Sequence, residues 1–261
     1  MRRLIRGTAR LLHRVRGYHP ARIGGERFRT DPDHIGFWRD VSRGRWEPAT
    51  FRFLERSLGP DSVFADVGAW IGPTTLFAAR RSRLVYGFEP DHDAYRYFLW
   101  NLRLNALANV VPMNAALGAE TGMRRLYGAG GRLGTSQSSL LAAADQPSMP
   151  VLSIAWRDWL EIAKPGRIDC IKMDIEGGEF ELLPAMRAQL EAERPALHLS
   201  LHAGRLPERE RKERLAEVLD PLRVYPSWRN EAGEPVTPEA LASVALAGDC
   251  VLLLTNGSRS R

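Results

Sequence analysis

The chain has 261 residues, which is enough for one α/β domain with its own hydrophobic core. Its composition is that of an ordinary globular protein, with 44% hydrophobic and 26% charged residues and a formal net charge of +6. Residues 1–30 hold nine arginines and one acid, so this segment carries +8 and the other 231 residues carry −2. The body of the protein therefore lacks the basic surface that binds phosphates, and we expect no nucleic-acid partner. No apolar stretch approaches the roughly 18 residues of a membrane-spanning helix, and we expect no signal peptide.

Residues 2–16 predict a basic amphipathic helix, because apolar side chains share one face and arginines occupy the other. Two interpretations stay open. Residues 1–20 make weak contact with an anionic membrane surface, or the helix packs on the domain or frays. Cys170 and Cys250 each lie in an apolar run, which is typical of buried thiols in a reducing compartment. We therefore expect a cytoplasmic protein, peripheral to the inner membrane face under the first interpretation.

From residue 61 onward, strand and helix patterns alternate along the chain. The predicted strands are 62–68, 83–90, 109–118, 167–176, 195–202 and 248–255. The predicted helices are 73–81, 92–105, 155–163, 178–192 and 208–219. Residues 129–149 are rich in glycine, alanine and serine and are expected to form a loop that is either a lid or a disordered connection. This alternation predicts an α/β fold with a mostly parallel sheet and helices on both faces.

The stretch FADVGAWIGPTTL (64–76) places a carboxylate and two glycines at a strand-to-helix turn. Gly68 and Gly72 allow close approach of the backbone, but the middle glycine of the dinucleotide fingerprint G-x-G-x-x-G is absent. Glu89 ends the next strand, where a carboxylate can accept both hydroxyls of a ribose. An acid at Asp66 suits an amine or a cation better than a pyrophosphate. The pair predicts S-adenosylmethionine rather than NAD, and the alternative is that both acids only cap helices.

The fourth and fifth predicted strands place ionisable residues along one face. Lys172, Asp174 and Glu176 alternate with apolar residues, so Lys172 requires an acidic partner, for which Asp174 is available. Glu179 stands at the start of the next helix, where negative charge is favourable and a capping role is expected. His198, deeper in the fifth strand, is expected to be a hydrogen-bonded core residue.

His202 lies at the end of the fifth strand, on the edge of the sheet where ligands bind. An alcohol loses its proton as its oxygen attacks a methyl group, and a base or a divalent metal can assist that step. We favour His202 as a base with an imidazole pKa of about 6–7, and Asp174 and Lys172 as the other catalytic residues. A divalent metal, Mg²⁺ or Mn²⁺, held by Asp174 and His202 is the alternative that stays open.

Four stretches, FADVGAWIGPTTL, GFEPD, NAALG and IDCIKMDIEGGEFELL, resemble the FkbM-type S-adenosylmethionine-dependent methyltransferases. The resemblance implies a class I methyltransferase fold, which is Rossmann-like and has a seven-stranded sheet whose last strand is antiparallel. It also implies O-methylation, often of sugar hydroxyls in polysaccharides or secondary metabolites. Trp70 and Ser200 depart from the family pattern, which often has Asn and Glu there. The expected cofactor-binding residues are Asp66, Gly68, Ala69, Gly72, Thr75, Glu89, Pro90, Asn114, Ala115 and Asp174.

We therefore predict a lead-in segment over residues 1–58, a methyltransferase domain over 59–256 and a tail over 257–261. The acceptor is expected to be a small molecule or a glycan, and the sequence carries no signal for the oligomeric state. Two other classes remain as alternatives. A nicotinamide-dependent oxidoreductase is disfavoured by the missing glycine and by Asp66. A non-catalytic binding module on a degenerate methyltransferase fold is disfavoured by the intact acids.

Overall fold

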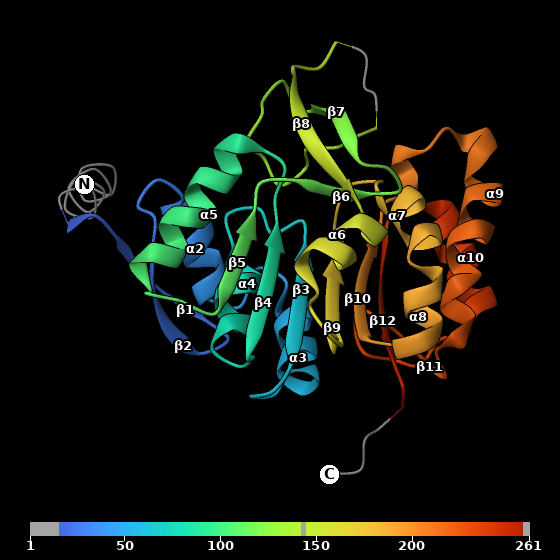
Figure 1. Ribbon diagram of the computed structural model, residues 1–261, viewed down its shortest axis with the longest axis horizontal. Coiled ribbons are helices and arrows are strands. Elements are labelled where there is room, and N and C mark those ends of the chain that lie inside the picture. The colour runs from blue at the N-terminus through green and yellow to red at the C-terminus, as the bar shows by residue number, and fades with distance from the viewer. Residues whose placement is uncertain (1–15, 142–144, 258–261) are drawn as a thin grey trace.

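The computed structural model describes residues 16–141 and 145–257, and its centre is a seven-stranded sheet (Figure 1). The strand order is β11-β12-β10-β9-β3-β4-β5. β12 is antiparallel to β10 and β11 on either side of it, and all other neighbouring strands of this sheet are parallel. This is the sheet that the resemblance to class I methyltransferases implies, so the predicted fold class is confirmed. The strands are β3 (Val63–Val67), β4 (Leu84–Phe88), β5 (Val110–Met113), β9 (Cys170–Met173), β10 (Ala196–Leu201), β11 (Ser227–Asn230) and β12 (Cys250–Thr255).

Two helical layers cover the sheet, one on each face. Side chains of each central strand alternate between the two faces, so both faces are apolar and both are buried by helices. Ala65 and Val67 of β3 pack in one core with the fully buried Trp159, while Phe64 packs in the other with the fully buried Trp38. The first layer holds α6 (Trp156–Ala163), α7 (Glu179–Ala185), α8 (Arg187–Glu193), α9 (Glu208–Leu219) and α10 (Pro238–Ala247). The second layer holds α2 (Ile35–Ser42), α3 (Pro48–Ser57), α4 (Pro73–Ala79) and α5 (His92–Leu104).

The lead-in segment is folded against the second layer, which the sequence patterns did not predict. Its hairpin consists of β1 (His19–Ile23) and β2 (Glu26–Thr30), which are antiparallel, and α2 and α3 follow. Ile23 and Leu54 are fully buried and belong to the same core as Phe64 of the central strand. This segment is therefore part of the domain's core from residue 19 onward. The helix predicted over 2–16 lies outside the described residues, apart from Arg16, and its membrane contact stays a prediction.

The predicted strand 109–118 is wrong as a single element. It divides into β5 and β6 (Ala116–Gly118), and β6 leaves the main sheet to join β7 (Gly122–Tyr127) and β8 (Ser148–Ala155) in a second sheet. The side chain of Asn114 lies at the division, where its amide donates to the carbonyls of Glu89 and Pro90. The second sheet stands beyond the carboxyl ends of β4 and β5 (Figure 1). We call the edge formed by these strand ends the carboxyl edge.

The predicted helix 178–192 is two helices, α7 and α8, which meet at Met186. Pro184 near the end of α7 has no N–H to donate to the helical ladder, which favours the break. Within residues 16–141 and 145–257, no helix is both long enough and apolar enough to cross a membrane.

Candidate active site

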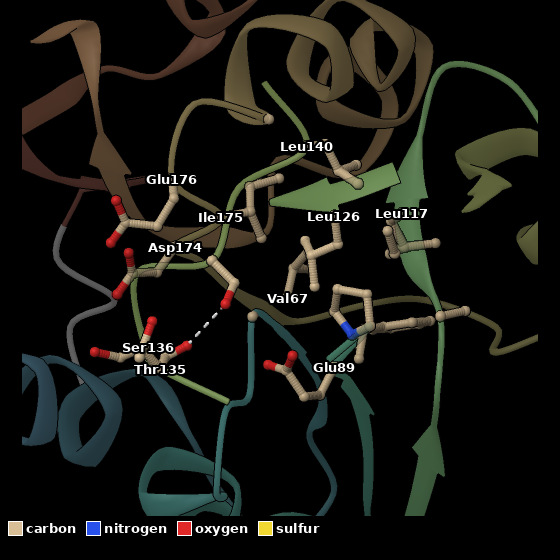
Figure 2. A pocket seen from close by; sticks show the side chains of 17 residues that line it. Val67, Glu89, Leu117, Leu126, Thr135, Ser136, Leu140, Asp174, Ile175 and Glu176 are labelled. Carbon is tan, nitrogen blue, oxygen red and sulfur yellow. Dashed lines mark hydrogen bonds between the residues drawn. The ribbon is translucent and has the colours of Figure 1, made fainter. Parts of the chain in front are cut away.

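One cavity lies at the carboxyl edge of β3, β4 and β9 and contains about 550 Å³ of space, part of it open to solvent. Figure 2 shows its two chemically different ends. The side chain of Glu89 enters from the end of β4, while the carboxylates of Asp174 and Glu176 lie together at the opposite side. Leu117 and Leu126 add apolar side chains to the lining of the cavity, on the side away from the two acids. An apolar cavity with a few convergent polar groups is typical of a site for a small organic ligand.

The cavity divides the predicted cofactor-binding residues into two groups. Those that line it are Gly68, Glu89, Pro90, Ala115 and Asp174. Those that lie outside its lining are Asp66, Ala69, Gly72, Thr75 and Asn114. Direct contact of the second group with a cofactor stays a prediction, because these residues do not line the cavity.

The two glycines after β3 serve different contacts. Gly68 has a φ of +88°, and a Cβ there would lie 2.0 Å from the carbonyl oxygen of Asp174. Gly72 has a φ of +94°, and a Cβ there would lie 2.6 Å from the ring of Phe98 on α5. Gly68 therefore lets the turn approach the end of β9, and Gly72 lets α4 pack against α5.

Glu89 is fixed at the cavity by two backbone donors. Its Oε2 accepts a hydrogen bond from the N–H of Trp70 at 2.8 Å, and its Oε1 accepts one from the N–H of Asp91 at 2.8 Å. Burial raises the pKa of Glu89 to about 8, although the two backbone hydrogen bonds act in the opposite direction. Trp70 itself adopts a left-handed φ of 49°, an uncommon conformation for a bulky residue.

Asp66 lies beneath the cavity and is fully buried. Its Oδ2 accepts hydrogen bonds of 2.6 Å from the hydroxyls of Thr74 and Thr75, which join the end of β3 to the first turn of α4. Lys172 lies 4.0 Å from Oδ1. Burial raises the pKa of Asp66, while Lys172 and the two threonines counteract that effect.

The predicted pairing of Lys172 with Asp174 is confirmed. The Nζ of Lys172 lies 3.3 Å from Oδ2 of Asp174 and donates to the carbonyl of Gly68 at 3.3 Å. Burial disfavours the charge of Lys172, but the neighbouring acids raise its pKa above the usual range, so it is a cation. Lys172 is only 3% exposed and ties the ends of β3 and β9 together.

His202 lies among three acids at the carboxyl edge of β10. Its Nε2 is 3.6 Å from Oδ1 of Asp174 and 3.8 Å from Oε1 of Glu176, and its Nδ1 is 3.0 Å from Oε1 of Glu179. Burial alone would lower the pKa of His202, but the hydrogen bond to Glu179 and the charges of all three acids raise it to about 9. The expected imidazole pKa of about 6–7 is therefore wrong, because the sequence did not reveal how many carboxylates surround the ring.

Glu179 is fully buried and accepts hydrogen bonds from the N–H groups of Ile175 and Gly177 at 2.9 and 2.8 Å. It therefore holds the turn before α7, whereas the N-cap of the helix itself, Gly178, has no side-chain hydrogen bond, so the expected capping role stays a prediction. Its contact with His202 across 23 residues of sequence was not predicted.

His198 is a core residue, as predicted. It is 1% exposed, and its Nε2 lies 2.9 Å from the hydroxyl of Thr50 on α3. Burial, with a further contribution from Lys172, lowers the pKa of His198 to about 4, so the ring is neutral. His198 therefore joins β10 to the lead-in segment and takes no part in lining the cavity.

The loop before β8 supplies one wall of the cavity, and its action as a lid stays a prediction. Asp91 holds this loop through hydrogen bonds from the N–H of Gly134 at 2.6 Å and the hydroxyl of Ser138 at 3.2 Å. The hydroxyl of Ser139 donates to the carbonyl of Glu176 at 2.5 Å. The loop residues that line the cavity are Thr135, Ser136, Ser138 and Leu140. Asp91 was missed as a site residue, although its place after the strand-ending Glu89-Pro90 pair could have indicated it.

Comparisons with known proteins identify the family of the chain. The family model described as the methyltransferase FkbM domain matches residues 66–225. The hexuronic acid methyltransferase AglP of Haloferax volcanii is 24% identical over 172 residues, which cover 64% of this chain and 66% of that protein.

The chain is also similar to solved structures. The methyltransferase FkbM from Methylobacillus flagellatus KT has a TM-score of 0.47 and 16% identity, covering 83% of this chain and 60% of that one. The M. jannaschii protein TYW2, solved in complex with AdoMet, has a TM-score of 0.45 and 17% identity, covering 91% and 84% of the two chains. The present chain thus spans less than two thirds of the length of AglP and of the M. flagellatus protein.

The family match is independent of the site geometry and includes all of its charged residues. It begins at Asp66, passes through Glu89 and the acids that follow β9, and continues beyond His202. Because residues 66–225 are well over half of the sequence, the chain belongs to the FkbM methyltransferase family.

Proposed function

We propose that this protein is an S-adenosylmethionine-dependent O-methyltransferase that acts on a hydroxyl group of a sugar. The observation that carries the proposal is the single cavity with Glu89 at one end and the acids beside His202 at the other. The first end offers a fixed carboxylate to a ribose, and the second offers polar groups to a reacting oxygen.

The residues at the cavity fit the cofactor. Glu89 would accept the ribose hydroxyls, and the apolar side chains of Ala115 and Leu117 would lie against the adenine. Burial alone would raise the pKa of Asp174, but Lys172 and the nearby histidines lower it, so the carboxylate is ionised and favours a positive sulfonium. When bound, S-adenosylmethionine supplies a methyl group on a sulfur that takes the bonding electron pair as the methyl leaves.

The acceptor would enter from the side on which the carboxylates of Asp174 and Glu176 lie (Figure 2). A sugar acceptor is supported by the resemblance to AglP, whose described activity is methylation of hexuronic acid. The acceptor hydroxyl must release a proton as its oxygen forms the bond to the methyl carbon. Asp174 is ionised and can accept a proton. In the ligand-free protein at neutral pH, His202 is protonated on both ring nitrogens and cannot accept another proton.

The proposed location of the protein is the cytoplasm. Cys170 is buried and Cys250 is half-buried, and both are free thiols. Free thiols are typical of a reducing compartment, which supports this location.

The proposal is tested by calorimetry and by methyl transfer with the full chain. S-adenosylhomocysteine is expected to bind with one-to-one stoichiometry, and NADH is expected to give no binding heat. Methyl transfer from labelled S-adenosylmethionine is then measured with the methyl glycosides of glucuronic acid and glucose and with small alcohols. Binding of NADH in place of S-adenosylhomocysteine would favour the oxidoreductase alternative. Cofactor binding without transfer to any acceptor in the panel would favour the binding-module alternative.

A further inference from the structure

We propose that Asp174, Glu176 and His202 form a binding site for one divalent cation at the acceptor end of the cavity. The catalytic role given to this cation depends on the proposed function, whereas its binding does not.

The three side chains surround one point. Each offers one ligand atom, namely an oxygen from each carboxylate and a ring nitrogen, and these atoms lie within 4.8 Å of one another. Nε2 of His202 is 3.6 Å from the Asp174 oxygen and 3.8 Å from the Glu176 oxygen. Ligands about 2.1 Å from an octahedral cation lie about 3–4 Å apart, so these separations suit a small divalent ion. Two carboxylates and one imidazole suit Mn²⁺ in particular, with the remaining positions left for water or substrate.

His202 is oriented as metal-binding histidines are. Its Nδ1 lies 3.0 Å from Glu179, which is fully buried and is itself fixed by the N–H groups of Ile175 and Gly177. A cation would displace the proton on Nε2 of His202. The proton on Nδ1 would stay donated to Glu179, and the lone pair of Nε2 would then face the two carboxylates. Ligation by one ring nitrogen while the other donates to a carboxylate is the usual arrangement at protein metal centres.

The two carboxylates are oriented in a similar way. Asp174 uses Oδ2 for Lys172, at 3.3 Å, and turns Oδ1 towards Nε2 of His202. Glu176 uses Oε2 for the guanidinium of Arg205, with one N–O distance of 3.1 Å, and turns Oε1 towards the same nitrogen. Each of the three ligands is therefore held through one atom and presents its other atom to the common point. Glu176 also has a left-handed φ of 52°, an uncommon backbone conformation for a glutamate.

When bound, the cation would lower the pKa of a coordinated acceptor hydroxyl, as metals do for bound water. The hydroxyl proton would pass to water. The acceptor oxygen then forms the new bond to the methyl carbon, the carbon–sulfur bond breaks, and its electron pair stays on sulfur in S-adenosylhomocysteine. No oxidant or reductant takes part.

The site is tested by Mn²⁺ binding to the full chain after treatment with EDTA and removal of the chelator. Mn²⁺ is titrated into the protein, and free Mn²⁺ is measured by electron paramagnetic resonance. One bound ion per chain is expected. Absence of stoichiometric binding to the wild-type protein would overturn the proposal, because the cluster would then be a proton-bridged ion pair only.

Variants locate the ion. Glu176→Gln removes one ligand charge and is expected to weaken Mn²⁺ binding at least tenfold. Glu179→Gln removes the charge that orients His202 and one of the two acceptors of the turn before α7, and it is expected to weaken Mn²⁺ binding roughly 10–100-fold, the range seen for outer partners of metal ligands. Glu181→Gln is the matched control, because Glu181 pairs with Arg124 away from the cavity lining, and it is expected to bind Mn²⁺ as the wild type does. Unchanged affinity in both of the first two variants would place the ion elsewhere and contradict the proposal.

Binding of S-adenosylhomocysteine separates this inference from the proposed function and reports on folding of each variant. Each variant is expected to bind S-adenosylhomocysteine. A variant that binds neither Mn²⁺ nor S-adenosylhomocysteine is set aside as misfolded. His202→Gln then replaces it, and it is also expected to weaken Mn²⁺ binding. Mn²⁺ binding without S-adenosylhomocysteine binding would contradict the proposed function and leave the cation site standing. Methyl transfer that is unaffected by EDTA would contradict the catalytic role of the ion.

Discussion

The two ends of the cavity are held by different kinds of interaction. At the cofactor end, Glu89 is fixed by two backbone N–H groups. At the acceptor end, the carboxylates of Asp174 and Glu176 are fixed by the side-chain cations Lys172 and Arg205. Backbone donors stay in place whatever side chain is substituted near them, whereas a side-chain ion pair loses both its geometry and its charge balance when one partner is changed. Substitutions should therefore be tolerated better at the cofactor end than at the acceptor end.

The largest effect is expected for Asp174→Asn. This change removes a negative charge between Lys172 and His202 that acts on the acceptor hydroxyl either directly or as a ligand of the cation. We expect turnover to fall roughly 10²–10⁴-fold, the range for loss of assistance to proton transfer. Binding of S-adenosylhomocysteine should persist, which calorimetry checks beside the rate measurement. Asp40→Asn is the control, because Asp40 is exposed on α2 and pairs only with Arg45 among the described ion pairs. Normal turnover in Asp174→Asn would show that the acceptor end does not need this charge.

The cofactor end is probed with Glu89→Gln, which keeps the shape of the side chain and removes its charge. We expect S-adenosylhomocysteine to bind roughly 10–100-fold more weakly, since hydrogen bonds to charged groups contribute about 1.5–3 kcal/mol each. Asp93→Asn, a mostly exposed position in the first turn of α5, serves as the control.

The pH dependence of cofactor affinity, compared between the wild type and Glu89→Gln, tests the same assignment. Because the pKa of Glu89 is raised to about 8, its carboxyl group is protonated at neutral pH in the ligand-free protein. Ribose hydroxyls donate to the ionised form, so binding releases the proton. The affinity of the wild type should therefore rise as the pH rises towards 8 and level off above it. Glu89→Gln should flatten this dependence. A wild-type affinity that is constant between pH 6.5 and 9 would contradict the assignment of Glu89 to the ribose.

The two ends meet at Gly68, whose turn contacts the carbonyl of Asp174. Gly68→Ala would combine a left-handed φ with a Cβ in contact with that carbonyl, and we expect a loss of about 1–3 kcal/mol in the free energy of unfolding. Gly25→Ala is a matched control, because Gly25 has a φ of +84° with no atom within 4 Å of the added Cβ. Urea unfolding of both variants measures the difference. Equal losses would show that the contact between the two ends adds nothing to the strain of the turn.

The smallest effect on either end is expected from deletion of residues 1–15. The described fold begins its hairpin at His19, so cofactor binding and thermal stability should be unchanged. If the arginine-rich segment contacts anionic membranes, the deletion should reduce sedimentation with phosphatidylserine vesicles and leave sedimentation with neutral vesicles unaltered. Equal sedimentation of the full and shortened chains would contradict the membrane interpretation.

The sequence by itself determined the strands β3, β4, β9, β10 and β12 of the central sheet and the cofactor end, whereas it missed β11 and did not divide β5 from β6. Apolar runs of strand length that end in Asp66 and Glu89, with glycines in the following turn, follow rules that act within a few residues. The pairing of Lys172 with Asp174 was also predictable, because alternation along a strand places both on one face. The family resemblance then supplied the direction of the last strand.

Only the tertiary structure decided what surrounds His202 and how the lead-in segment folds. Glu179 lies 23 residues before His202, and Arg205 lies 29 residues after Glu176, so no local pattern reports these contacts. Three carboxylates around one imidazole raise its pKa to about 9. Their combined effect depends on their distances from the ring in space rather than on their spacing in the sequence. The β1–β2 hairpin was missed for the same reason, because its short strands are stabilised by burial against the main core rather than by their own propensity.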